Sequence, residues 1–192
     1  MSSTSAMTDF LPKTGLWSIE PLHSSVSFSL RHHGVATFRS GFTNISGTYD
    51  AAQRQLVGKV QASDVTLSGL DKLKAHFLTS DFMNAEEFPT LSFRSTSIEN
   101  DGHQLKLEGE LTFRGITKPI SATGSFGGPQ TLQHKRDGSG TTSERLGIDL
   151  TSTIDRREWG MTFNTEMVPG VLNLGWKVKL EAALELIKNV EH

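Results

Sequence analysis

The sequence contains no cysteine. This absence excludes a disulfide framework, a thiolate metal site and a cysteine nucleophile. Positive and negative charges nearly balance, with 19 basic and 21 acidic side chains, so the basic excess and high pI of a nucleic-acid-binding protein are missing. No window approaches the run of about 18 apolar residues that a membrane helix needs. The chain is therefore expected to be soluble.

Residues 1–15 carry none of the marks of a targeting segment. They are small and polar, with neither a basic start nor an apolar run of signal-peptide length. We therefore interpret the chain as a cytoplasmic protein. Residues 1–15 are interpreted as a flexible lead. Residues 16–188 are interpreted as one domain, because all-β barrels of roughly 200 residues often form a single unit.

What the sequence does contain is a regular alternation of apolar and polar side chains. Residues 104–113 read QLKLEGELTF, so Leu105, Leu107 and Leu111 share one face and charged residues share the other. Residues 176–186 repeat the pattern. A period of two is typical of a strand with one buried face, and such strands favour an antiparallel sheet. The predicted fold class is all-β: an antiparallel barrel of about eight strands, with space inside for one small ligand.

Some segments break the alternation. The spacing of Leu70, Leu73 and Phe77 predicts a short helix over about residues 70–79. Residues 127–144 are nearly devoid of apolar side chains, which predicts a mobile loop. The sequence also predicts a strand over residues 56–67 and a second long loop over residues 155–170.

Four motifs resemble, in order and spacing, those of the YceI-like family. They are PLHSSVSFSLRHHG (residues 21–34), DFMNAEEFPTLSF (81–93), GELTFRGITKPISATGSF (109–126) and RREWGM (156–161). The resemblance extends from about Trp17 to Ile187. It implies an extended lipocalin-like barrel that binds polyisoprenoid chains, such as isoprenoid quinones or polyprenyl phosphates. It also implies a non-enzymatic role in transport or storage, no cofactor besides the bound lipid, transient membrane contact and a homodimer.

Two groups of apolar residues are candidate ligand contacts. The predicted lumen residues are Val26, Phe28, Leu30, Phe38, Phe42, Leu107, Leu111, Phe113 and Trp176. The predicted lid residues, in the helical segment and the loops, are Phe77, Phe82, Met83, Phe88, Trp159, Met161 and Phe163. Methionine adapts well to irregular apolar surfaces. The alternatives are a solid core for the first group and a plug that seals one barrel end for the second.

Basic side chains are the candidates for a polar head group. They are Arg31, His33, Arg156 and Arg157, because guanidinium groups bind phosphate in a bidentate manner and histidine adds a donor. The alternative for the last two is a solvated loop or a salt bridge with Asp155 or Glu158.

Two other functions remain open. An isoprenoid-modifying enzyme, such as a hydrolase or cyclase, would need a perturbed acid or base inside the barrel, for which the candidates are His33, Asp149 and Asp155. A haem or metal barrel would need several converging ligands, whereas His32 and His33, adjacent on a strand, face opposite sides. No catalytic residue and no metal ligand is assigned.

Overall fold

The computed structural model describes residues 11–67, 71–133 and 142–189. Within this part of the chain, eight antiparallel strands form a closed barrel. In barrel order they are β1 (Leu16–Ile19), β4 (Ser46–Asp50), β5 (Gln55–Gln61), β6 (Thr90–Asp101), β7 (Gln104–Phe113), β8 (Ile116–Gln133), β9 (Thr142–Asp155) and β12 (Leu174–Lys188). Pairing of β1 with β12, from Trp17↔Lys188 to Ile19↔Leu186, closes the ring.

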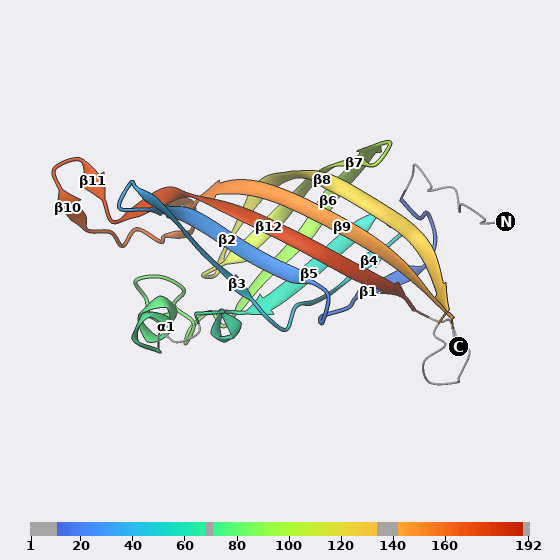
Figure 1. The fold of residues 1–192 in the computed structure, drawn as a ribbon, viewed down its shortest axis with the longest axis horizontal. Coiled ribbons are helices and arrows are strands. Elements are labelled where there is room, and N and C mark those ends of the chain that lie inside the picture. The colour runs from blue at the N-terminus through green and yellow to red at the C-terminus, as the bar shows by residue number, and fades with distance from the viewer. Residues whose placement is uncertain (1–10, 68–70, 134–141, 190–192) are drawn as a thin grey trace.

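The barrel is closed at one end and splayed at the other, because β12 changes partner along its length. Its final residues pair with β1, whereas Leu174 to Ala183 pair with β2 (Ser25–His32). β2 forms a hairpin with β3 (Ala36–Phe42). Among the described residues, the outer edge of β3 pairs with no further strand and meets the segment after η1 through one isolated bridge, Phe42↔Val65, and hydrogen bonds between Gly41 and Thr66. The helix α1 (Asp71–Leu78) lies at this splayed end (Figure 1).

Two short helices and one small hairpin complete the structure. They are the 3-10 helices η1 (Ala62–Asp64) and η2 (Arg156–Trp159), and the strands β10 (Glu166–Val168) and β11 (Val171–Leu172). The β10–β11 hairpin lies at the same end of the long axis as the β2–β3 turn, and β1 lies toward the other end (Figure 1). No helix in the described part of the chain combines the length and apolar character needed to cross a bilayer.

The closed end of the barrel is solid. Trp17 and Tyr49, cross-strand partners, are 1% and 0% exposed, and so are Leu146 and Leu186, another such pair. The preceding segment joins this core: Leu11 is buried, and Tyr49 donates its hydroxyl to the carbonyl of Pro12 at 3.2 Å. Residues 1–10 of the predicted lead lie outside the described residues.

Three local predictions need correction. The strand expected over 56–67 ends at Gln61, where η1 begins. The mobile loop expected over 127–144 is largely strand, because β8 continues to Gln133 and β9 starts at Thr142; its middle, 134–141, lies outside the described residues. Backbone hydrogen bonds hold this polar extension, and a register shift after Gly127 starts it. The loop expected over 155–170 contains η2 and β10.

The predicted helix is present as α1. Leu70, the first residue of the predicted span, lies outside the described residues. The helix is followed by a turn in which Met83 and Ala85 donate their N–H groups to the carbonyls of Phe77 and Leu78. These bonds fold the turn back against the helix. The helix and the turn together form a cover over the splayed end of the barrel, which we call the cover.

Candidate ligand-binding cavity

An elongated cavity of about 530 Å³ occupies the barrel between the solid end and the splayed end. Along β12 its wall runs from Leu174 to Leu184, through Val178, Leu180 and Ala182. Because of a register shift, the four steps from Leu174 to Val178 lie opposite only two steps of β2. The wall therefore spans about eight strand steps, or ~26 Å at about 3.3 Å per residue. The volume lies in the range of about 300–1,000 Å³ typical of small-molecule sites.

Most of the predicted lumen residues lie on this wall. They are Val26, Phe28, Leu30, Phe38, Phe42, Leu111 and Phe113. Phe28 is the centre of an aromatic group: its ring lies 5.7 Å from Phe42, 6.3 Å from Phe38 and 5.7 Å from Phe77 of α1, stacked on the last at 7°. Aromatic side chains from two strands and the helix therefore form one continuous apolar surface.

Two predicted lumen residues are not on the wall. Leu107 is 1% exposed and packed in the core away from the cavity. Trp176 lies in a stretch of β12 where the register shifts between Leu174 and Val178, which interrupts the alternation used to orient it. Its ring is only half-buried and lies 4.4 Å from the guanidinium carbon of Arg156.

The predicted lid residues fall into two groups. Phe77, Phe82, Met83 and Met161 line the cavity, together with Leu73. The other three predicted lid residues do not line it. Trp159 is buried and donates its indole N–H to the carbonyl of Leu111 at 3.2 Å. Phe163 meets the rings of Phe82 and His76 edge-on, each at 5.2 Å. Phe88 packs over the backbone of Gly115.

Polar contacts hold this cover in place. His76 Nε2 lies 2.8 Å from Asp81 Oδ2, which links α1 to the following turn. Arg114 donates to the carbonyls of Ser80, at 2.8 Å, and Phe82. Sequence reasoning missed Arg114, although it lies in the GELTFRG motif and has the left-handed φ of +50° that marks a tight turn. The same side chain therefore anchors the β7–β8 turn to the cover.

Arg156 supplies a buried positive charge at the splayed end of the cavity. It is 2% exposed and lines the wall. Its guanidinium donates to four backbone carbonyls, those of Gly175 (3.1 Å), Met161 (2.8 Å), Phe163 (2.9 Å) and Leu174 (3.5 Å). Among the described residues it forms no ion pair. Burial lowers the pKa of Arg156 to about 10, so the side chain stays charged at neutral pH.

The other predicted head-group residues are directed elsewhere. Arg157 binds Asp155 in a bidentate manner, at 2.9 and 2.6 Å. Arg31 is exposed and donates to the carbonyl of Gly34 at 2.8 Å. His33 is not on the cavity wall, whereas His32, stacked on it at 3.8 Å, is. His32 continues the alternation of Leu30, so the period-two pattern already distinguished the two histidines.

The three acid–base candidates provide no poised catalytic group. Asp149 is exposed. Asp155 is buried, but hydrogen bonds from Arg157, aided by Lys177 at 3.6 Å, hold the pKa of its carboxyl well below the usual range. His33 lies off the wall.

Comparison with known proteins shows the family of the chain. The YceI-like domain model matches residues 17–186. The chain belongs to the YceI-like family. A UPF0312 protein of Staphylococcus aureus is 29% identical over 168 residues, covering 85% of this chain and 92% of that protein.

Two solved structures share the fold of this YceI-like domain. BcnA of Burkholderia cenocepacia has a TM-score of 0.66 and 15% identity, covering 87% of this chain and 98% of that one. A polyisoprenoid binding domain from Saccharophagus degradans has a TM-score of 0.65 and 10% identity, with 90% and 98% coverage.

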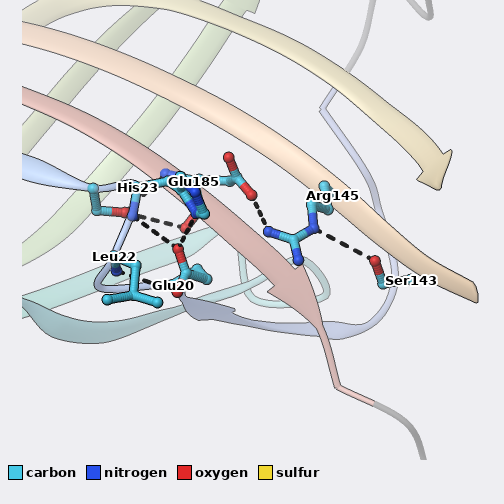
Figure 2. A network of polar contacts seen from close by, with 7 residues as sticks. Glu20, Leu22, His23, Ser143, Arg145 and Glu185 are labelled. Atoms are coloured by element: carbon cyan, nitrogen blue, oxygen red, sulfur yellow. Dashed lines mark hydrogen bonds and ion pairs between the residues drawn. The ribbon is translucent and has the colours of Figure 1, made fainter. Parts of the chain in front are cut away.

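A separate polar cluster lies at the start of β2 (Figure 2). Side-chain atoms of Glu20, His23 and Glu185 lie within 4.8 Å of one another, as metal ligands would. Each carboxylate already has partners, however. Glu20 accepts from the backbone N–H of Leu22 (3.2 Å) and of His23 (2.8 Å), and from the His23 ring, while Glu185 pairs with Arg145.

Burial alone would raise the pKa of Glu20, but these hydrogen bonds bring it below its ordinary value. We therefore interpret the cluster as a set of polar contacts that stabilise the β1–β2 connection.

Proposed function

We propose that this YceI-like domain binds the apolar chain of a polyisoprenoid lipid in its cavity and carries or stores it without chemical change. The observation on which the proposal depends is a long cavity with an almost wholly apolar wall inside a closed barrel. The description of the Saccharophagus degradans neighbour as a polyisoprenoid binding domain supports the same ligand class.

The energetics indicate which part of the ligand sets selectivity. Burying a methylene group contributes about 0.8 kcal/mol relative to water, so a chain of about twenty carbons gains on the order of 15 kcal/mol before ordering costs. Such a lipid is not free in water, however, and the bilayer that competes for it is equally apolar. Net preference for the protein must therefore come from the shape of the cavity and from the head group.

The polar residues orient the ligand. Ile19 and Leu184 line the end next to the solid core, whereas His32 and Arg156 line the splayed end. Of the five N–H groups of Arg156, four correspond to the observed bonds to carbonyls. The fifth is available to a quinone carbonyl or a phosphate oxygen. We therefore place the head group beside Arg156 and His32. Arg31, His33 and Arg157 would contribute only after leaving their present partners.

The test is to identify what the protein contains. Protein purified without detergent is extracted with organic solvent, and the extract is analysed by mass spectrometry. We expect a prenyl lipid in amounts comparable to the protein, and native mass spectrometry should show the matching mass increase. Delipidated protein should take up added isoprenoid quinone or polyprenyl phosphate. A barrel that is empty on purification and takes up neither lipid would refute the proposal.

A further inference from the structure

Exposed apolar side chains gather where the cavity reaches the surface. Val35, in the β2–β3 turn, is 78% exposed, and Val168, in the β10–β11 hairpin, is 57% exposed. Leu73 of α1 is 39% exposed and also lines the cavity. We call these three residues the apolar rim. All three belong to elements at the same end of the molecule (Figure 1).

The two hairpins are neighbours. A Cβ atom at Gly34 would lie 3.9 Å from Cγ1 of Val171, so the β2–β3 turn touches β11. Both hairpins also lead directly into the cavity wall: His32 is three residues before Val35, and Leu174 is three residues after Val171. The rim is therefore continuous with the apolar interior through two strands and the helix.

The β2–β3 hairpin carries the basic charge of the rim. Residues 21–49 include Arg31, His32, His33 and Arg39 but no acidic residue, and both arginines are exposed. The other two elements are mixed in charge: α1 and the following turn carry Lys72 and Lys74 as well as Asp71, Glu86 and Glu87. The β10–β11 hairpin carries Glu166, whose carboxylate accepts the N–H of Gly170. Apolar side chains flanked by basic residues are the combination that partitions into the interface of a bilayer containing anionic lipids.

We propose that the apolar rim docks onto the surface of an anionic bilayer, and that the lipid enters and leaves the cavity there. The inference rests on the proposed function, because a polyisoprenoid partitions into membranes and must be taken from one. When the two valines of the rim insert into the bilayer, the lipid has a continuous apolar path from the bilayer past Leu73 into the barrel. The path avoids exposing the chain to water.

The test compares two variants of the full chain. Val35→Ser combined with Val168→Ser removes the apolar rim from both hairpins. Leu22→Ser is the matched control: Leu22 is more exposed, at 87%, but it precedes β2 whereas Val35 follows it. The eight residues of that strand separate the two sites by ~26 Å. Binding is measured by co-flotation with vesicles of phosphatidylcholine and phosphatidylglycerol, and transfer is measured from vesicles that contain a radiolabelled polyprenyl phosphate.

We expect the double variant to bind vesicles about tenfold more weakly than the unmodified protein, with a parallel loss in transfer rate. Leu22→Ser should match the unmodified protein, and added salt or pure phosphatidylcholine should weaken binding. All three proteins should take up the same lipid equally from detergent micelles.

Equal vesicle binding by the double variant and the unmodified protein would overturn the inference. So would a change only in oligomeric state, which would assign the rim to a second copy of the chain. Failure of every protein to take up lipid from micelles would instead refute the proposed function.

Discussion

Filling the inner end of the cavity should shorten the longest lipid that the protein can hold. Gly58 lies on the same face of β5 as Leu56 and Val60, and all three line the cavity. A Cβ atom at Gly58 would lie 3.9 Å from the Ser46 carbonyl oxygen and 4.0 Å from Ile19 Cδ1, which is ordinary contact. Gly58→Leu therefore fits without displacing the backbone and extends into the space that we assign to the end of the chain.

The size of the effect follows from the atoms added. Leucine brings four carbon atoms into the cavity and displaces about as many from the ligand. At about 0.8 kcal/mol for each methylene group, a lipid that fills the cavity loses ~3 kcal/mol, or about 200-fold in affinity. A lipid one isoprene unit shorter ends before Gly58 and should lose nothing.

The assay is a chain-length series of polyprenyl alcohols, with affinities measured by competition against a fluorescent lipid. Gly127→Leu is the control, because it adds the same atoms on β8 where a Cβ atom meets nothing within 4 Å and where the cavity does not reach. The control should bind the whole series as the unmodified protein does. Unchanged affinity of Gly58→Leu for the longest lipid would refute the assignment of the chain to this cavity, provided that circular dichroism shows an intact barrel.

Further predictions concern the charged residues and the helix. Because Arg157 lowers the pKa of Asp155, the carboxylate stabilises the fold above its unfolded pKa of about 4, and this contribution disappears as the pH falls through the lower folded value. Asp155→Asn should thus cost about 1–2 kcal/mol at neutral pH, with a difference in urea unfolding that shrinks in acid. Arg156→Lys replaces the buried guanidinium by an ammonium group that cannot donate to all four carbonyls, and should lower the free energy of unfolding by about 3 kcal/mol. Arg157→Lys, at a half-exposed site, should lower it by less than about 1 kcal/mol. Phe77→Ala removes the ring that stacks on Phe28 and should speed lipid release to acceptor vesicles about five- to tenfold, as followed by stopped-flow fluorescence.

Alternation in the sequence predicts which face of a strand is apolar, but not the height of a residue along the barrel. Leu107 and Leu111 share one face of β7, yet the first packs in the core away from the cavity and the second lines it. The difference depends on the stagger of eight strands, which arises only when the barrel closes. Trp176 shows a second limit, because a register shift next to it reverses the simple expectation from its neighbours.

The polar composition of the paired ends of β8 and β9 predicts a loop, but backbone hydrogen bonds make these ends strands. Residues 127–133 contain little that is apolar, yet they pair with β9 as an extended ladder, because backbone groups supply those bonds whatever the side chains. Residue type alone indicates that Arg156 is a candidate cation. Its burial and its four carbonyl partners depend on how η2 folds back against β12, which no local pattern encodes.

The seam between β1 and β12 has a consequence for how the domain forms. The first and last strands of the described chain complete the ring together, so the contacts that seal it have nearly the largest sequence separation that the molecule offers. High contact order slows folding, into the range of milliseconds to seconds for β-rich domains. A chain whose last strand has not yet paired would expose the apolar wall of the cavity to water, and exposed apolar surface of this kind favours aggregation.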